Sequence, residues 1–307
     1  TLSRILVLSP ILLGLSNLFG SITQVFKRFF LYALSPLLYN VGIIIGILTF
    51  YPFFGISGLG YGVILGAFLH MTIQIPFLIR RKLMPRLTIR LRFQELRRVV
   101  LTSLPRSLTL SVSHLALLVL LSFGSLMSTG SIAVFNLSFN LQSVPLSIIG
   151  VSYSLAAFPV LVALYSAGER ERFLDQVITS ARHIIFWSLP AMVLFIVLRA
   201  QIVRVILGSG NFTWSDTKLT AAALALFCIS LLAQSLILLL VRAFYSIGDT
   251  RTPLIANLVS AVLAVFLSLV FLRLFTGNYD IQFTFERLLR VQDVRGTEVL
   301  MLALGYS

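Results

Sequence analysis

Charge, and negative charge above all, is scarce in this sequence. Only 11% of its 307 residues are charged and ten are acidic, whereas 58% are hydrophobic. Soluble domains carry about a quarter charged residues. Together with a mean hydropathy of +1.00, this composition excludes an ordinary soluble domain and predicts a protein that lies in lipid.

Cysteine is nearly absent as well. The single Cys228 lies in the apolar run Ala221–Leu240, which excludes a disulfide framework and a cysteine metal cluster. We predict no metal site and no cofactor. A signal peptide is also missing, and Thr1 lies close to the first apolar run. Because the last run, Glu298–Ser307, is shorter than the ~20 residues of a membrane crossing, we expect the sequence to be a fragment.

Long apolar runs recur along the whole sequence. They exceed the ~10 residues of a barrel strand and do not alternate in polarity, so α-helix is the structure that suits them. The predicted fold class is an all-α polytopic membrane protein with about eight transmembrane helices. The expected spans are Leu2–Thr23, Phe30–Phe50, Ile56–Ile79, Val99–Leu121, Ile132–Val162, Ile184–Leu198, Leu219–Leu240 and Leu254–Phe271.

Proline and glycine interrupt several of these runs. Proline lacks a backbone donor and kinks a helix, whereas glycine lets two helices approach closely. We expect kinks at the prolines and close helix packing at the glycines of the third run. The residues concerned are Pro10, Pro36, Pro145 and Pro159, and Gly55, Gly58, Gly60, Gly62 and Gly66.

Positive charge is abundant by comparison. Lys+Arg 24 against Asp+Glu 10 gives a net charge of +14, which in a soluble protein would indicate nucleic acid but in a membrane protein indicates orientation. Successive connections alternate sides, which divides the basic residues into two groups, and the larger is predicted to be cytoplasmic. We therefore expect membrane lipids and no nucleic acid as partners, an external start, and three missing helices before it. The larger group is Lys27, Arg28, Arg80, Arg81, Lys82, Arg86, Arg90, Arg92, Arg97, Arg98, Arg106, Arg170, Arg172, Arg182, Arg242 and Arg251; the smaller is Arg4, Arg199, Arg204, Lys218, Arg273, Arg287, Arg290 and Arg295.

Four segments together carry a family resemblance. They are Leu31–Gly46, Gly58–Pro76, Leu141–Pro159 and Arg242–Pro253, the last containing Phe-Tyr-Ser-Ile-Gly-Asp-Thr-Arg-Thr-Pro. In order and spacing they resemble the fifth, sixth and eighth helices, and the connection before the eleventh, of the MurJ/MviN family. These proteins are flippases of the polyprenyl-linked peptidoglycan precursor lipid II in the MOP exporter superfamily. The resemblance implies an incomplete MOP/MATE-like bundle of two lobes, from about the fourth helix to the start of the twelfth.

The resemblance also implies a domain organisation. Residues 1–82 would be the rest of the N-terminal lobe, with three helices, and residues 99–275 the C-terminal lobe, with five. Residues 83–98 would form a basic cytoplasmic linker, since Phe93–Val100 has the pattern of an interfacial amphipathic helix. Residues 276–307 would hold an external segment and the start of a truncated helix.

The eighth helix departs from the family at its candidate substrate contact. The family commonly has an Asp-Arg pair there, and the arginine is regarded as a substrate contact, whereas this sequence has Phe139 and Asn140. Asn136, Asn140 and Gln142 are uncharged but can donate hydrogen bonds. Their acceptors would be either a substrate in a cavity or groups on neighbouring helices. Arg106, near the start of the seventh helix, is a further candidate, pointing into a cytoplasmic vestibule or to lipid headgroups.

A second group of candidates is structural or gating. Gly248 permits a tight turn, Asp249 can cap the following helix, and Arg251 would lie at the cytoplasmic surface, with Thr250 between them. Pro145 interrupts the eighth helix. We interpret these residues as a hinge or gate.

Polar residues are few inside the other spans. A sodium site of some family members falls on Leu120, Ala264 and Ser268, which offer too few oxygen ligands. His70 and His114 are predicted to be neutral and hydrogen-bonded, and a proton relay is the alternative.

Three functions follow from these observations. The first is a monomeric transporter in the bacterial cytoplasmic (inner) membrane that flips lipid II by alternating access, with cavity arginines drawn mostly from the missing helices. The second is a MOP-type exporter of another lipid-linked glycan, motivated by Asn140. The third is a membrane-embedded glycosyltransferase or ligase, which would need a carboxylate or metal near the lipid phosphate. No acidic residue lies deep in a predicted span, so we expect no catalytic residues and no enzyme.

Overall fold

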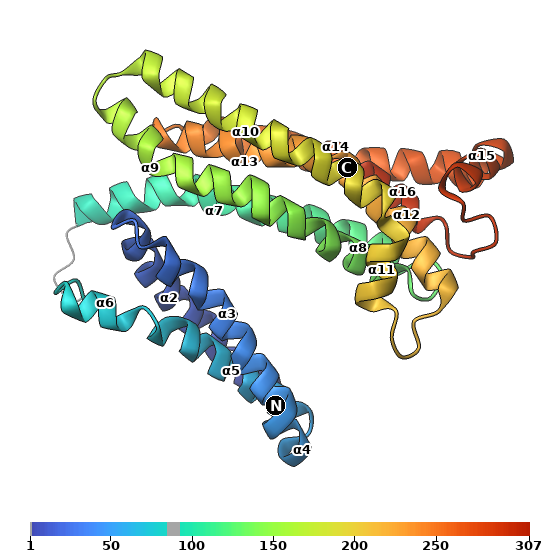
Figure 1. The fold of residues 1–307 in the computed structure, drawn as a ribbon, viewed down its shortest axis with the longest axis horizontal. Coiled ribbons are helices and arrows are strands. Elements are labelled where there is room, and N and C mark those ends of the chain that lie inside the picture. Colours follow the sequence, from blue (N-terminus) through green and yellow to red (C-terminus); the bar gives the residue numbers. More distant parts are fainter. Residues whose placement is uncertain (1, 85–92) are drawn as a thin grey trace. The chain divides into compact units, whose positions relative to one another are not determined.

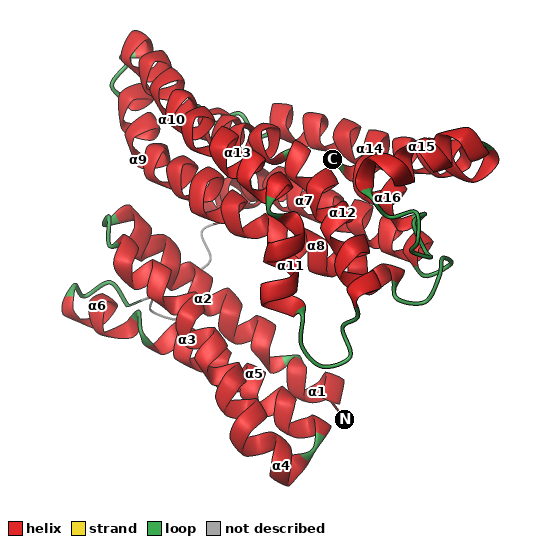
Figure 2. Cartoon of the chain, turned by 45° about the vertical axis from the view of Figure 1, so that its right-hand side comes forward, coloured by secondary structure: helices red, strands yellow, loops and turns green. Residues whose placement is uncertain are grey.

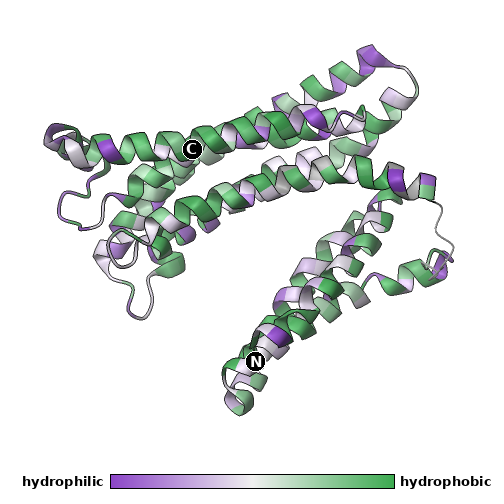
Figure 3. Cartoon of the chain, turned by 180° about the vertical axis from the view of Figure 1, so that it is seen from behind, coloured by the Kyte–Doolittle hydropathy of each residue, from purple (hydrophilic) through white to green (hydrophobic). Residues whose placement is uncertain are grey.

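The computed structural model describes residues 2–84 and 93–307. The described residues form helices joined by short loops and contain no strand (Figures 1 and 2). The chain divides into two compact units, Thr1–Leu91 and Arg92–Ser307. Figure 3 shows hydrophobic residues along the lengths of the helices and the most hydrophilic ones near several helix ends.

The eight predicted spans are all helical, and the predicted all-α polytopic membrane fold is confirmed. Among the described residues, six segments are long and apolar enough to cross a membrane, and a bent helix pair is a seventh. The remaining predicted span falls in α7 (Phe93–Gly124), whose described apolar part, Ser111–Gly124, is shorter than these segments. The six are Leu2–Val25, Phe29–Phe54, Ile56–Arg80, Ser131–Ser166, Arg170–Val197 and Arg251–Gly277.

The first unit contains three hydrophobic spans, each interrupted at least once. Helices α2, α3 and α5 pack against one another (Figure 1). Its elements are α1 (Leu2–Leu6), α2 (Leu8–Val25), α3 (Phe29–Ile45), the π-helical turn η1 (Gly46–Phe50), α4 (Tyr51–Phe54), α5 (Ile56–Thr72) and α6 (Ile75–Arg80).

Glycine brings α3 and α5 into backbone contact, as the sequence predicted. A Cβ atom on Gly62 would lie 2.6 Å from the Cα atom of Gly46, and one on Gly42 would collide with the backbone of Gly66. No side chain fits at these positions, because such distances are far below van der Waals contact. Gly55 differs: it has φ 56° and no atom near its Cβ position, so it serves the turn between α4 and α5.

The second unit contains the remaining helices. It comprises α7, α8 (Ser131–Leu146), the π-helical turn η2 (Ser147–Val151), α9 (Ser152–Ser166), α10 (Arg170–Val197), α11 (Arg199–Leu207), α12 (Trp214–Ile229), α13 (Leu231–Ser246), α14 (Arg251–Gly277), α15 (Tyr279–Leu289) and α16 (Val299–Tyr306).

Two helices of this unit extend beyond the expected spans. Helix α10 begins at Arg170, well before Ile184, because its first turns carry polar residues that lengthen the helix without lengthening the apolar run. Helix α7 begins at Phe93, so the expected interfacial helix Phe93–Val100 continues directly into the span. No glycine or proline separates the two between Phe93 and Leu104, which leaves nothing to end the helix.

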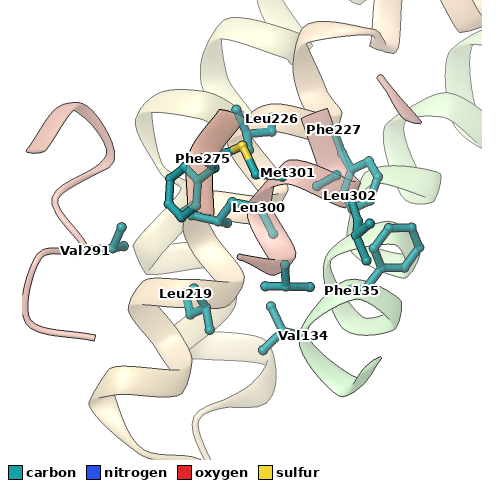
Figure 4. Close-up of a cluster of buried hydrophobic side chains, with 14 of the residues drawn as sticks. Val134, Phe135, Leu219, Leu226, Phe227, Phe275, Val291, Leu300, Met301 and Leu302 are labelled. Atoms are coloured by element: carbon teal, nitrogen blue, oxygen red, sulfur yellow. The ribbon is translucent and has the colours of Figure 1, made fainter. Parts of the chain in front are cut away.

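The core of the second unit forms around the short helix α16. Its residues Val299, Leu300, Met301, Leu302 and Ala303 are all buried, and they pack among side chains of α7, α8, α12 and α14 (Figure 4). The segment expected to be only the start of a truncated helix is therefore an integral part of the packing.

Basic residues assigned to the same side of the membrane also lie together in each unit. In the second unit, Arg199, Lys218 and Arg290 line one cavity of about 620 Å³, and the Lys218 Nζ atom lies 2.6 Å from a carboxylate oxygen of Asp293. All three cations belong to the predicted external group. The clustering agrees with the alternation of connections, and the identity of the cytoplasmic side stays a prediction.

The glycine contact between α3 and α5 can be tested with one methyl group. Gly62→Ala should lower the melting temperature of the full-length protein in detergent, because overpacking a tight contact costs about 1–3 kcal/mol. Gly14→Ala is the matched control, since nothing lies within 4 Å of its Cβ position, and it should leave the melting temperature unchanged or raise it. Equal effects of the two substitutions would contradict the contact.

Candidate transport site

The candidate polar residues of α8 lie on two different faces of the helix. Asn136 and Asn140 are four residues apart and share one face; Asn140 is exposed and Asn136 is partly buried. Within the described part of the chain, neither side-chain amide forms a hydrogen bond with another residue. This face therefore offers two neutral amide groups that are free to bind a ligand.

Gln142 lies on the other side of α8, facing α13. Its side chain is fully buried, and its Nε2 atom donates to Oε1 of Gln234 across 3.4 Å. The structure therefore separates Gln142 from the two asparagines and places it between helices. Of the two roles left open by the sequence, Gln142 takes the interhelical one.

Gln142 contacts a break in the neighbouring span. Helices α12 and α13 meet at Ser230 with a bend of 45°. Ser230 Oγ donates to the Phe227 carbonyl at 2.8 Å, and Gln234 Nε2 donates to Ser230 Oγ at 2.7 Å. A chain of polar groups thus runs from α8 into the bend, and the Oε1 atom of Gln142 is buried without a described partner.

Ser230 and Gln234 were not among the residues predicted from the sequence. The available signal was their spacing of four residues in an otherwise apolar run, which places two polar groups on one helical face. The partner on α8 could not be read from this spacing, because Gln142 and Gln234 are 92 positions apart.

Phe139, at the position where the family commonly has an acidic residue, belongs to an aromatic cluster. Its ring lies 5.5 Å from that of Tyr306, 5.8 Å from that of Phe227 and 6.4 Å from that of Phe135. These distances are those of favourable aromatic pairs. A carboxylate at this position would be surrounded by rings, so the packing suits the phenylalanine that this chain has there.

Proline 145 is followed by a change of helix type. Pro145 lies inside α8, and the backbone becomes π-helical at η2 before α9 continues the span. A Cβ atom on Gly150 in η2 would lie 2.9 Å from the Cα atom of Ser235 in α13. The interrupted part of this span therefore packs directly against the span that bends at Ser230, and π-helical turns of this kind are frequent at functional sites.

The turn before α14 has the predicted cap. Gly248 has φ 83°, and the Oδ1 atom of Asp249 accepts hydrogen bonds from the backbone N–H groups of Arg251 at 2.9 Å and Thr252 at 3.1 Å. Its Oδ2 atom accepts from the Thr252 hydroxyl at 2.6 Å. Thr250 is the residue just before the helix. The hydroxyl and backbone donors of Thr252, with the N–H and charge of Arg251, lower the pKa of the Asp249 carboxyl.

A second buried polar cluster lies in the first unit, at the break between α5 and α6. Ser16 Oγ lies 2.6 Å from the Nδ1 atom of His70, and Gln74 Nε2 donates to Ser16 Oγ at 2.9 Å and to the His70 carbonyl at 3.1 Å. The predicted hydrogen bonding of His70 is confirmed. His114 is exposed on α7.

The remaining candidates occupy structural positions or lie outside the description. Arg106 belongs to α7, but its side chain lies outside the described residues. Leu120 and Ser268 are buried, the latter against Gly305 of α16. Among the described residues, no group of three or more His, Cys, Asp or Glu side chains is placed to hold a metal ion.

The apolar spans of this chain are interrupted by π-helical turns and by a polar break, and neutral polar groups lie at the interruptions. Such interrupted spans are typical of multi-pass membrane transporters. The sequence profile of one such family, described as Lipid II flippase MurJ, matches residues 1–279. The chain belongs to this family.

Individual relatives agree with this assignment. A probable lipid II flippase MurJ from Bdellovibrio bacteriovorus is 32% identical over 265 residues, which cover 85% of this chain and 49% of the relative. The corresponding protein from Thermotoga maritima is 30% identical over 245 residues, covering 80% and 48%. The chain thus spans about half the length of these curated relatives.

Two solved structures share the fold. The first, a lipid II flippase MurJ in an inward closed conformation, is 23% identical with a TM-score of 0.69 and covers 97% of this chain and 57% of its own. The second, a mutant of the Vibrio cholerae MATE transporter VcmN, is 17% identical with a TM-score of 0.68 and covers 99% and 67%. The fold is therefore MATE-like, and the chain is a multi-pass protein of the bacterial cytoplasmic membrane.

The contact between Gln142 and Gln234 can be measured with a double-mutant cycle. Gln142→Leu alone should destabilise the protein by about 1 kcal/mol, because it removes the described partner of the Oε1 atom of the half-buried Gln234. Gln142→Leu combined with Gln234→Leu should recover part of that loss, giving a coupling of about 0.5–1.5 kcal/mol in unfolding experiments. Strictly additive losses would contradict a direct hydrogen bond between the two side chains.

The cap before α14 makes stability depend on pH. Since hydrogen bonds lower the pKa of Asp249 in the folded protein, the stabilisation is complete above the unfolded pKa of about 3.9 and is lost as the pH falls through the folded pKa. Asp249→Ala should melt at a lower temperature than the wild type at pH 7, and the gap should narrow as the pH falls below the unfolded pKa of about 3.9. Asp249→Asn retains an acceptor and should lie between them at pH 7. A gap that does not narrow at all below the unfolded pKa would contradict the cap.

Proposed function

We propose that this chain forms part of a transporter that flips lipid II, a polyprenyl-pyrophosphate-linked peptidoglycan precursor, across the bacterial cytoplasmic membrane. Membership of the lipid II flippase family over residues 1–279 carries the proposal. The protein acts by alternating access, as a monomer, and as a transporter and not as an enzyme.

The polar face of α8 is the part of this chain proposed to meet the substrate. Asn136 and Asn140 present amide donors that are engaged with no other described residue, and such donors suit the sugar hydroxyls and phosphate oxygens of a lipid-linked glycan. Amides supply no net charge, so the cations that balance the pyrophosphate are proposed to come mostly from helices outside this chain, with Arg106 as a further candidate within it.

The interrupted helices supply the proposed moving parts. The bend at Ser230 and the π-helical turn η2 lie side by side, since Gly150 approaches Ser235. A span that is already broken changes its angle without losing a regular run of backbone hydrogen bonds. The turn Gly248-Asp249-Thr250-Arg251, together with Pro145, acts as the hinge or gate on the same spans.

A second candidate function has one observation in its favour. Phe139 and Asn140 replace the Asp-Arg pair that commonly occupies this part of the family's eighth helix, and the structure packs Phe139 into an aromatic cluster. The lost arginine favours export of a different lipid-linked glycan, with a substrate that needs less charge at this point.

Complementation decides between the two functions. The full-length gene, expressed in a bacterium depleted of its own lipid II flippase, should restore growth and cell shape. Correct membrane insertion would be verified by proteolysis of a tagged copy. Correct insertion without rescue would exclude lipid II and favour the other glycan.

Asn136 and Asn140 should affect transport more than stability. Asn136→Ala with Asn140→Ala should lower lipid II flipping in proteoliposomes about tenfold, because a hydrogen bond to a charged group is worth about 1.5–3 kcal/mol. Phe135→Leu is the matched control on the same helix, because Phe135 is buried in the aromatic cluster and its truncation should lower the melting temperature without a comparable loss of flipping. Transport that tracks the melting temperature in both variants would contradict a substrate contact.

A further inference from the structure

A basic cavity lies at one end of the first unit. It has a volume of about 520 Å³ and is lined by three arginines, Arg28, Arg80 and Arg81, together with apolar residues. A cavity of this size is in the range of small-molecule and headgroup sites. The apolar residues are Phe30, Leu31, Ile73, Pro76 and Phe77.

Three chain segments build this cavity, and their ends are well fixed. The rings of Phe26, after α2, and Phe77, in α6, meet at a centroid distance of 6.0 Å. Both helices end with a left-handed residue, Lys27 and Lys82, each with φ 56°. Schellman hydrogen bonds close both ends, from Arg28 N to the Thr23 carbonyl at 2.8 Å and from Leu83 N to the Leu78 carbonyl at 2.9 Å. The backbones that carry the arginines are therefore held in place.

No carboxylate of this unit neutralises the arginines. The first acidic residue of the sequence is Glu95, so the unit Thr1–Leu91 contains none. None of the three guanidinium groups forms an ion pair with a described residue. Three like charges around one concavity repel one another, and an anion in the cavity would remove that repulsion.

The surroundings of the cavity select the kind of anion. The cavity lies at the ends of the candidate spans Leu2–Val25 and Ile56–Arg80, and the end of a membrane-spanning segment is where the chain meets the lipid headgroups. Its arginines belong to the group predicted to be cytoplasmic, and the inner leaflet is rich in anionic lipid. Phe30, Ile73 and Phe77 offer apolar surface beside the cations, which a free inorganic ion would leave uncovered and an acyl chain would cover.

The start of α3 adds donors to the same place. Phe30 and Leu31 belong to the first turn of α3, whose cap residue Arg28 makes no side-chain capping bond. The N–H groups of such a turn carry partial positive charge. They strengthen a site that the cavity and the three guanidinium groups already define.

We propose that this cavity binds the phosphate of an anionic phospholipid of the inner leaflet, held by Arg28, Arg80 and Arg81, with an acyl chain on Phe30, Ile73 and Phe77. The site shares no residue with the polar face of α8 and does not depend on which lipid-linked glycan the protein exports. The bound lipid fixes the α2–α3 turn to the end of α6.

The test is a lipid titration of the full-length protein in detergent, followed by native mass spectrometry. Phosphatidylglycerol should bind the wild type much more tightly than phosphatidylcholine. Arg28→Gln, Arg80→Gln and Arg81→Gln should each weaken phosphatidylglycerol binding about fivefold, the worth of one basic residue near a membrane surface. Lys27→Asn with Lys82→Asn is the matched control, because these cations lie at the same end but do not line the cavity. Asparagine also tolerates their left-handed backbone.

The outcomes separate the proposal from its alternatives. Loss of binding in the arginine variants, with less than about a twofold change in the lysine control, supports the site. Equal losses in both sets would show a general surface attraction and overturn it. Tighter binding of undecaprenyl pyrophosphate than of phosphatidylglycerol, lost in the same arginine variants, would also overturn it, because the cavity would then be a substrate site. Circular dichroism and melting temperature would verify that every variant is folded.

Discussion

Lipid offers no hydrogen-bond partners to the backbone, and this constraint decides where polar side chains lie in the protein. A helix interrupted inside the membrane leaves carbonyl groups that must find donors within the protein. At the break between α5 and α6, the Gln74 amide donates to the His70 carbonyl. At the bend between α12 and α13, the Ser230 hydroxyl donates to the Phe227 carbonyl. At both of these breaks, a side chain of a buried polar cluster thus serves a backbone carbonyl group beside the interruption.

The two units meet the same constraint with different packing. In the first unit, glycines let the backbones of α3 and α5 touch, so that the contact depends on the absence of side chains at Gly42, Gly46, Gly62 and Gly66. In the second unit, large rings and the apolar helix α16 fill the space between α8, α12 and α14. Glycine contacts hold two helices at one fixed separation, whereas aromatic side chains leave their helices further apart. Asn136 and Asn140 directly follow Phe135 and Phe139, so the asparagine face is turned by about 100° from the face that carries these rings.

Structural features that depend on neighbouring residues could be predicted from the sequence. Features that depend on contacts between residues far apart in the sequence could not. The spans followed from long apolar runs, and the cap at Asp249 from the residues around it. Glycines in the third run indicated close helix packing, but the partner glycines Gly42 and Gly46 of α3 became visible only in the structure. The sequence also grouped Asn136, Asn140 and Gln142 as one candidate site. The structure divides them, because Gln142 pairs with Gln234 on a helix 92 positions away. The π-helical turn after Pro145 was expected only as a kink, since helix type depends on the neighbour packed at Gly150. The early start of α10 was hidden because its first turns are charged and carry no apolar signal.

The burial of α16 has a consequence for how the protein is made. Phe135, Phe139 and Phe227 are synthesised long before Tyr306, which completes their cluster. At about 5–20 residues per second, the ribosome reaches α16 several seconds after α12 has emerged. During that interval the helices around the future core have no apolar side chains to fill it. Helix α16 therefore completes the packing of this core. Helices α8, α12 and α14 can enter the membrane one by one, but they reach their final packing only after α16 has entered between them.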